Sequence, residues 1–364
     1  MPDYESEIKA LEDELKKTDY NKRTQMHVGM VKAKIARLKE AQVKRSGGGK
    51  KTEGYSVRKS GDATVILIGF PSVGKSTLLN SLTGAGSRVG SYDFTTLDVI
   101  PGMLNFNHAR IQVLDVPGIV YGAASGRGRG KEVLAVMRGA DLAIIIIDVN
   151  HPEHLDALQR EIREAGLRLN QKKPEIIIKR RSKGGIDVAS TVKLTKITKE
   201  TISNILKEFR SSNADVILRD DIDVDQFIDA VEANKVYIPA LVILNKIDVV
   251  PEERLEQLVK ELNPDICISA DRKVNIEELK KKIFLKLDMI RVYCKEVGKE
   301  ADLNVPLIMR RGATVNDMCN KLHKDFASKF KFARVWGGSA KFPGQKQMLK
   351  HILMDGDIVE INVR

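Results

Sequence analysis

Hydrophobic spacing divides the chain into regions of different character. Apolar residues at helical spacing predict two helices, at about 4–17 and about 24–44, with a polar break at Asp19–Lys22 between them. Strand-like apolar stretches follow at 64–68, 111–115, 142–148 and 240–244. The stretch at 142–148 is so apolar that it is typical of a strand buried on both faces at the centre of a parallel sheet. The pattern predicts a helical hairpin followed by an α/β domain with a mostly parallel sheet.

The last two of these strands are separated by Val149–Pro239, which is far longer than one crossover helix requires. After a helix at about 154–165, the pattern predicts two strands about a turn at Gly184–Gly185, and then helices near 199–209 and 224–233. We therefore expect a small α+β lobe, inserted at about 168–237. Its basic turn could contact RNA, although a solvated tip is equally natural; the residues are Lys179, Arg180, Arg181 and Lys183.

From about Val292 onwards short strands surround a helix. The helix is expected near 318–326, and strands follow at about 333–336 and 358–363. This ββαββ-like order predicts a ubiquitin-like, β-grasp domain at 291–364. Its candidate RNA-contact face consists of Lys329, Lys331, Arg334, Trp336 and Lys341, although Trp336 could equally belong to the core.

Charge changes the picture once it is divided among these regions. Residues 1–60 hold 15 Lys+Arg against 9 Asp+Glu, residues 61–290 hold 32 against 32, and residues 291–364 hold 14 against 8. The net charge of +12 therefore lies entirely in the two flanks. Basic flanks suggest a polyanionic partner, for which ribosomal RNA is the obvious candidate, while the alternative is that surface lysines only keep the protein soluble.

The first motif that carries chemistry is G-x-x-x-x-G-K-[ST], between an apolar strand and a helix-like run. Its backbone N–H groups and the following helix dipole suit a polyphosphate. Lys75 should reach the β- and γ-phosphates, and Ser76 should bind Mg²⁺. The predicted nucleotide contacts at this loop are Gly69, Phe70, Pro71, Ser72, Val73, Gly74, Lys75, Ser76 and Thr77.

Further motifs follow at the ends of the later strands. Asp115 is a candidate for the outer coordination shell of Mg²⁺, and it precedes Val116-Pro117-Gly118, whose glycine can offer an N–H to a γ-phosphate. Asp248, in the tetrad Asn245-Lys246-Ile247-Asp248, can accept from the N1–H and N2 amino groups of guanine, which adenine lacks. Ser269-Ala270 can place a backbone N–H near guanine O6. The order of these motifs predicts a guanine-nucleotide site.

Between the loop and Asp115 lies Tyr92-Asp-Phe-Thr-Thr-Leu-Asp98, where Phe94, Thr95 and Thr96 suit a first switch. A Thr hydroxyl would close on Mg²⁺ only while the γ-phosphate is present, and we favour Thr96 over Thr95. Without the other motifs, the same stretch would be an ordinary polar loop. A glycine-rich second switch is expected at 119–130.

Phe-Thr-Thr in the first switch, Asp115-Val-Pro-Gly-Ile119 and Arg127-Gly-Arg-Gly130 resemble Obg-related GTPases. Within that group the whole chain is similar to the developmentally regulated GTP-binding protein (DRG) family. The resemblance implies a GTPase linked to ribosomes and translation. It also implies an N-terminal helical hairpin, an insertion in the GTPase (G) domain and a C-terminal TGS domain.

Ile119 stands where Ras-like GTPases have the glutamine that orients the attacking water. Lys75, Thr96 and Gly118 remain as catalytic candidates. The water must be oriented by another group: a backbone group of the second switch, a first-switch Thr, Arg127 or Arg129, or a monovalent cation such as K⁺. Potassium-stimulated relatives typically carry Asn at the position of Ser72, which places K⁺ dependence in question.

We therefore expect slow GTP hydrolysis to GDP that a protein partner, the ribosome or a cation accelerates, in a ribosome- or translation-associated switch. Two alternatives stay open: a scaffold that binds guanine nucleotide without turnover, and a ribosome-assembly factor whose GTPase is a checkpoint. The expected domains are a helical hairpin (1–45), a linker (46–60), the G domain (61–290) and the TGS domain. No apolar run reaches membrane-spanning length and no signal peptide opens the chain, so we expect a cytoplasmic monomer with no membrane partner.

Two further clusters resemble metal sites. Asp221, Asp223, Asp225, Asp229 and Glu232 have calcium-loop spacing, but Gln226 stands where the turn needs glycine, which favours an acidic helix start. His151 and His154 lie at a helix start without a third ligand nearby in sequence, and we interpret them as surface or capping residues.

Overall fold

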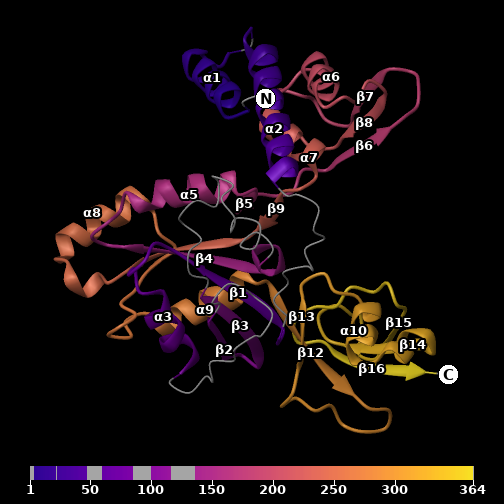
Figure 1. The fold of residues 1–364 in the computed structure, drawn as a ribbon. Coiled ribbons are helices and arrows are strands. Elements are labelled where there is room, and N and C mark those ends of the chain that lie inside the picture. Colours follow the sequence, from indigo (N-terminus) through magenta and orange to yellow (C-terminus); the bar gives the residue numbers. More distant parts are fainter. Residues whose placement is uncertain (1–3, 22, 47–59, 85–99, 116–135, 364) are drawn as a thin grey trace. The chain divides into compact units, whose positions relative to one another are not determined.

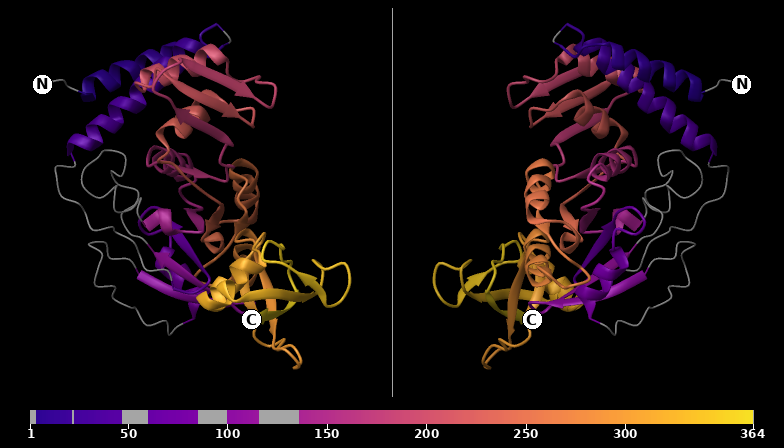
Figure 2. Two further views of the ribbon diagram at one scale, coloured as in Figure 1. Left: turned by 90° about the vertical axis from the view of Figure 1, so that its right-hand side faces the viewer. Right: turned by 90° about the vertical axis from the view of Figure 1, so that its left-hand side faces the viewer.

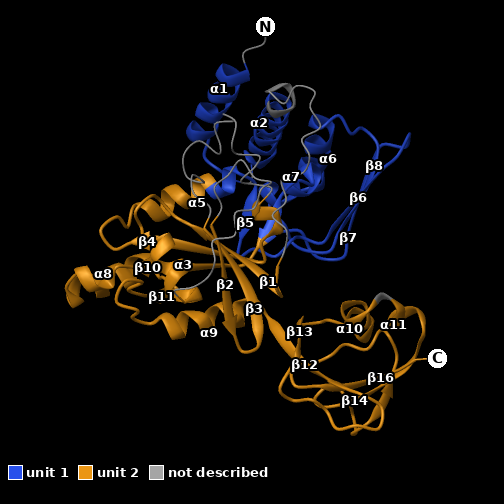
Figure 3. Ribbon diagram, turned by 60° about the horizontal axis from the view of Figure 1, so that its bottom comes forward, with its two compact units in different colours: residues 1–54, 124–130, 162–237 blue, residues 55–123, 131–161, 238–364 orange. Residues whose placement is uncertain are grey.

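The computed structural model describes residues 4–21, 23–46, 60–84, 100–115 and 136–363, and the chain divides into two compact units (Figures 1 and 3). One unit combines residues 1–54, 124–130 and 162–237, and the other combines residues 55–123, 131–161 and 238–364. Within the described residues, no helix is both long enough and apolar enough to cross a membrane.

The second unit is built on a six-stranded sheet with the order β11-β10-β4-β1-β3-β2 (Figure 1). Only β2 is antiparallel to its neighbour, so the predicted mostly parallel sheet is confirmed. Its strands are β1 (Ala63–Ile68), β2 (Ile100–Phe106), β3 (Ala109–Asp115), β4 (Leu142–Asp148), β10 (Ala240–Asn245) and β11 (Ile266–Cys267).

Helices cover both faces of this sheet, which explains why β1 and β4 are buried at every position. On one face, α3 (Lys75–Thr83) and α9 (Ile276–Lys286) pack against alternate residues of β1 and β4. Figure 1 shows α5 (His154–Glu164) and α8 (Glu252–Leu262) across the sheet from them. With the strands clamped in this way, their carboxyl ends form one fixed edge.

In the first unit, α1 (Tyr4–Lys17) and α2 (Gln25–Ser46) run side by side as an antiparallel hairpin (Figure 2). Ile8 of α1 packs against a stripe on α2 that includes Val31 and Ile35. In the turn between the helices, just before α2, the Asn21 side chain accepts hydrogen bonds from the backbone N–H groups of residues 23 and 24. The two helices predicted from the sequence are confirmed.

The inserted lobe belongs to the same unit as this hairpin. Ala33 of α2 is fully buried in the lobe's own core, beside α6 and α7. The lobe consists of β5 (Leu167–Leu169), β6 (Ile176–Arg180), β7 (Ile186–Ser190), α6 (Lys199–Glu208), β8 (Ala214–Leu218), α7 (Val224–Glu232) and β9 (Val236–Ile238). The N-terminal helices and the insertion, distant in sequence, are therefore held together by one apolar core.

The two strands predicted in the lobe are confirmed as β6 and β7, but the sequence did not indicate how they pair. They flank Gly184–Gly185 and do not pair with each other as a hairpin, because β8 lies between them. Strand β8 is antiparallel to β6 and parallel to β7. Strand β8 has only five residues, with Asp215 among four apolar ones, and such a short pattern does not indicate a position in the middle of the sheet.

The C-terminal part of the second unit is a five-stranded sheet, β13-β12-β16-β14-β15, packed on one side by helices. This confirms the predicted β-grasp arrangement. Trp336 is half-buried, with the Lys295 ammonium 5.0 Å from its ring centroid. The elements are β12 (Met289–Lys295), β13 (Leu307–Arg310), α10 (Val315–Leu322), α11 (Lys324–Ser328), β14 (Phe330–Trp336), β15 (Gln345–Gln347) and β16 (Ile358–Val363).

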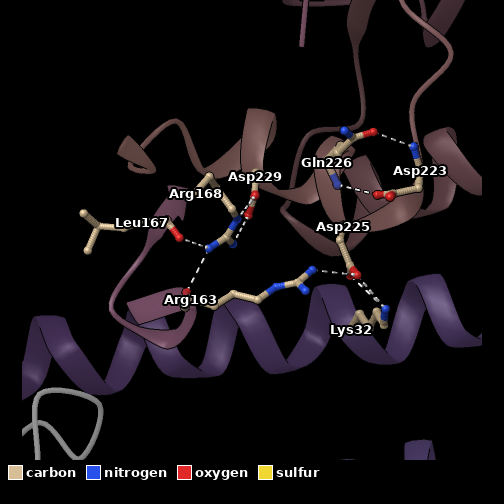
Figure 4. A network of polar contacts seen from close by, with 8 residues as sticks. All are labelled: Lys32, Arg163, Leu167, Arg168, Asp223, Asp225, Gln226 and Asp229. Atoms are coloured by element: carbon tan, nitrogen blue, oxygen red, sulfur yellow. Dashed lines mark hydrogen bonds and ion pairs between the residues drawn. The ribbon is translucent and has the colours of Figure 1, made fainter. Parts of the chain in front are cut away.

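A network of ion pairs and hydrogen bonds joins α7 to β5 and to α2 within the first unit (Figure 4). Arg168 binds Asp229 through two hydrogen bonds of 2.5 and 2.7 Å, and both side chains are less than a tenth exposed. Asp225 lies 2.8 Å from the Lys32 ammonium of α2. Asp223 forms the α7 N-cap, in a capping box with Gln226. These carboxylates all have protein partners, as expected of an acidic helix start.

We expect Asp229→Ala to lower the free energy of unfolding of this unit by about 3–5 kcal/mol, because it leaves the buried Arg168 guanidinium without its counter-charge. Urea denaturation followed by circular dichroism measures the change. The control is Asp13→Ala, which removes a half-exposed carboxylate from a surface pair with Lys16 and should change stability by no more than about 0.5 kcal/mol. Equal stability of both variants would contradict a structural role for the buried pair.

Candidate functional site

The loop at 69–74 leaves the end of β1 and enters α3, which begins at Lys75. Gly74 is the N-cap of α3 and has a φ of 95°, in the left-handed region that favours glycine. A Cβ at Gly74 would lie 2.5 Å from the Asn245 side chain, and one at Gly69 would lie 2.8 Å from the carbonyl oxygen of Ile146. Close packing therefore requires glycine at both positions, and at Gly74 the loop conformation requires it as well.

Lys75 folds back over this loop. Its ammonium donates hydrogen bonds to the carbonyl oxygens of Gly69, at 3.0 Å, and Phe70, at 2.9 Å. Burial lowers the pKa of Lys75, while the nearby Asp115 carboxylate opposes that effect. The ammonium is thus held at the mouth of the loop, where the first turn of α3 also directs its free N–H groups.

Ser76 and Asp115 meet beside Lys75. The Ser76 hydroxyl donates to Asp115 Oδ2 at 2.7 Å, which joins α3 to the end of β3. Asp115 is 3% exposed, and its other oxygen, Oδ1, is buried without a hydrogen-bond partner among the described residues. A hydroxyl and an unsatisfied carboxylate oxygen side by side are the donor atoms that Mg²⁺ prefers, so the residues fit this cation.

Asn245 connects the loop at 69–74, which we call the phosphate loop, to the loop after β11. It is 1% exposed, and its Nδ2 donates to the carbonyl oxygen of Val73 at 2.8 Å. Its Oδ1 accepts a hydrogen bond of 3.0 Å from the backbone N–H of Ala270. One buried amide therefore fixes the positions of two loops that are almost 200 residues apart in sequence.

Lys246 follows in a left-handed conformation, with a φ of 68°. Its ammonium donates to the carbonyl oxygen of Ser72 at 2.8 Å and to Asp148 Oδ2 at 2.7 Å. Burial pushes the pKa of Asp148 upwards, but hydrogen bonds from Lys246 and Asn150 outweigh this and hold it below the usual range. Asp148 was missed by sequence reasoning, although it ends β4 just as Asp115 ends β3.

Asp248 lies in a short 3₁₀ helix, Ile247–Val249. A hydrogen bond from the Ser269 hydroxyl holds the pKa of Asp248 below its usual range, and Arg272 lies 3.2 Å away. The carboxylate borders a pocket of about 200 Å³. The pocket is lined by Gly74, Thr77, Asn245, Lys246, Asp248, Val249, Ser269, Ala270 and Asp271.

The structure brings together residues from both ends of the predicted site. Val73 is buried under the loop, Pro71 is exposed, and the half-buried Phe70 stacks on His154 with 4.0 Å between ring centroids. The two switches cannot be compared with their predictions. Phe94, Thr95, Thr96, Val116, Pro117 and Gly118 lie outside the described residues.

His151 and His154 have a third polar neighbour, contrary to the expectation from sequence. The Glu153 carboxylate lies 3.1 Å from His151 and 4.0 Å from His154, so the three potential ligand atoms are within 4.8 Å of one another. The two imidazole rings are stacked, however, 4.9 Å apart and 19° from parallel. The lone pairs of two nearly parallel stacked rings do not point at a common ion. The stack therefore favours a packing role, in which His154 supports the Phe70 ring.

Three family sequence profiles match consecutive parts of the chain. The family described as a 50S ribosome-binding GTPase matches residues 64–181, and a profile for the C-terminal region of that domain matches residues 183–289. The TGS domain matches residues 290–363. The chain is therefore a GTP-binding protein of the 50S ribosome-binding GTPase family.

Relatives match over almost the whole length. An uncharacterized GTP-binding protein of Methanocaldococcus jannaschii is 53% identical, with 99% of this chain and 93% of the relative covered. Developmentally-regulated GTP-binding protein 1 homolog of Dictyostelium discoideum is 44% identical, with 97% and 98% covered. Developmentally-regulated GTP-binding protein 2 of Homo sapiens is 41% identical, also with 97% and 98% covered. The chain belongs to the developmentally regulated GTP-binding protein family of Obg-related GTPases.

Proposed function

We propose that this protein binds GTP with Mg²⁺, hydrolyses it slowly, and works as a switch on the ribosome. The observation that carries the proposal is the bridge made by Asn245, which joins the phosphate loop to the pocket beside Asp248. A ligand that fills this pocket and reaches Lys75 needs a base at one end and phosphates at the other. GTP meets both requirements.

At the base end, the ionised Asp248 carboxylate accepts from the N1–H and N2 amino groups of guanine. Adenine has no matching pair of donors, so binding an adenine nucleotide would leave a charged acceptor unsatisfied, at a cost of about 1.5–3 kcal/mol for each lost bond. The Lys246 stem lies along the base, held by Asp148 and Ser72. The Ala270 N–H donates to the Asn245 side chain, and this hydrogen bond holds the loop at 269–270 where it approaches guanine O6.

At the phosphate end, Lys75 exchanges its two carbonyl contacts for the β- and γ-phosphate oxygens, and the α3 N-terminus donates backbone N–H groups. Ser76 and Asp115 would hold Mg²⁺, which supplies charge neutralisation on the phosphates when bound. Thr96 and Gly118, as proposed from the sequence, complete the contacts to the γ-phosphate.

The hydrolytic step lacks one group. Ile119 has no hydrogen-bonding side chain with which to orient water, where Ras-like enzymes use a glutamine. The missing orientation must come from elsewhere, such as the ribosome, a regulatory protein or a monovalent cation. The same feature supports the second candidate function, a guanine-nucleotide-binding scaffold without significant turnover.

We expect Asp248→Asn to lower GTP affinity by about 100-fold or more, because the neutral amide no longer accepts both guanine donors. Affinity for xanthosine triphosphate, which carries a carbonyl in place of the amino group, should fall less or rise. Competition against a fluorescent nucleotide measures both constants. Lys75→Ala should bind neither nucleotide, and retained GTP affinity in that variant would contradict the assigned phosphate contacts.

Asp148→Ala should weaken GTP binding by about 10-fold and leave the preference for guanine over adenine intact, because it releases Lys246 but not Asp248. Nucleotide titrations with GTP and ATP give the affinity and the ratio separately. Glu252→Ala, which removes an exposed carboxylate from the first turn of α8, is the matched control. A changed GTP/ATP ratio in Asp148→Ala would show that the residue acts on base choice and not on positioning Lys246.

Turnover should be slow for the protein alone and rise by about 10³-fold or more when the missing stabilisation is supplied in trans. Phosphate release is measured with and without ribosomes, and with K⁺ replaced by Na⁺. Sedimentation with ribosomes, loaded with a GTP analogue or with GDP, tests whether the nucleotide controls association. Rates that stay negligible under all conditions would favour the scaffold, and a fast basal rate would contradict both candidates.

A further inference from the structure

A basic tip stands at one end of the inserted lobe, and the middle position of β8 creates it. We define the basic tip as residues 179–185 and 207–213. Because β8 lies between β6 and β7, the turn after β6 and the loop before β8 meet at the same end of the sheet. Asn213 joins them: its Oδ1 accepts from the Gly185 N–H at 2.8 Å, and its carbonyl oxygen accepts from the Arg181 N–H at 3.0 Å.

Cations from both segments are collected at this end. Arg180, Lys183, Lys207 and Arg210 are exposed, and none of these four has an ion-pair partner among the residues that the structure describes. The exposed Lys179 and the exposed Asp187 of β7 also lack ion-pair partners in the described part of the chain, and they cancel each other in the charge count. Two further acidic groups nearby are matched by other cations. Asp215 lies 2.6 Å from Arg181, and Glu208 lies 2.9 Å from Arg37 of α2. The tip therefore carries an uncompensated charge of about four, although the region 61–290 as a whole is neutral.

The tip also lacks exposed aromatic rings on which bases could stack. Its only aromatic residue is Phe209, which is partly buried against the lobe core. Single-stranded RNA is typically held by exposed aromatic rings on which bases stack, whereas RNA helices are bound mostly through phosphates and shape. A side chain at Gly184 would have only one Arg181 atom within 4 Å, and one at Gly185 would have no neighbour within that distance. The backbone of this turn is therefore open to close approach by a phosphate.

We propose that the basic tip binds the phosphate backbone of double-stranded RNA. This inference rests on the proposed work at the ribosome and names one surface and one partner class for it. The sequence suggested RNA contacts in the charged flanks and, as one of two interpretations, in the basic turn at 179–183. The structure adds Lys207 and Arg210 to that turn and specifies the partner as a duplex. The tip belongs to neither the nucleotide pocket nor the phosphate loop, so the two proposals can fail independently.

The test is fluorescence anisotropy of the full chain with a labelled RNA duplex of about 20 base pairs, and with one of its strands alone, over a series of salt concentrations. We expect tighter binding to the duplex. In the variant R180Q/K183Q/K207Q/R210Q, the slope of log affinity against log salt should decrease in magnitude by about 3–4, and duplex affinity near 0.1 M salt should fall by about 10-fold or more.

The matched control is K173Q/K193Q/K199Q/R219Q, which removes the same charge from exposed positions at the opposite end of the lobe. It should leave duplex binding nearly unchanged. An equal loss in both variants, or no loss in the tip variant, would overturn the proposal. Competition by polyglutamate as effective as that by unlabelled duplex would also overturn it, in favour of an acidic protein partner. Unchanged GTP affinity in the tip variant separates its outcome from that of the nucleotide site.

Discussion

The proposed nucleotide site depends on the buried amide of Asn245. This side chain satisfies a carbonyl of the phosphate loop and an N–H of the loop after β11, and no other side chain in the described site contacts both. An amide has one donor group and one acceptor, which is what a bridge between a backbone carbonyl and a backbone N–H requires. Without it two buried backbone groups would lose their partners, and the phosphate and base regions would no longer share a fixed frame.

The parallel sheet turns that local contact into a site. All its parallel strands end at one edge, so the last residues of β3, β4 and β10 are brought together without any contact between them in sequence. Asp115, Asp148 and Asn245 occupy these positions. Each has a different partner. Asp115 accepts a hydrogen bond from the Ser76 hydroxyl, Asp148 accepts one from the Lys246 ammonium, and Asn245 bridges the two loops.

The other unit has a different organisation. Its core includes residues from the N-terminal hairpin and from the insertion, and the Arg168–Asp229 pair lies buried within it. Because each of these segments buries its apolar face against the other, neither is expected to be stable alone. The unit therefore presents its basic residues on a rigid frame, and this distinguishes the tip from a flexible charged tail.

The fold class, the family, the N-terminal hairpin and the main parallel strands could be read from the sequence alone, as could one helix and two strands of the β-grasp domain. The nucleotide motifs could be read from it as well, because glycine, lysine and carboxylate positions are set by local backbone geometry at strand ends. Three features needed the tertiary structure: the pairing of Asp148 with Lys246, the shared core of hairpin and insertion, and the position of β8 between β6 and β7. Each depends on contacts between segments far apart in the chain, and such contacts leave no periodic signal in the residues that make them.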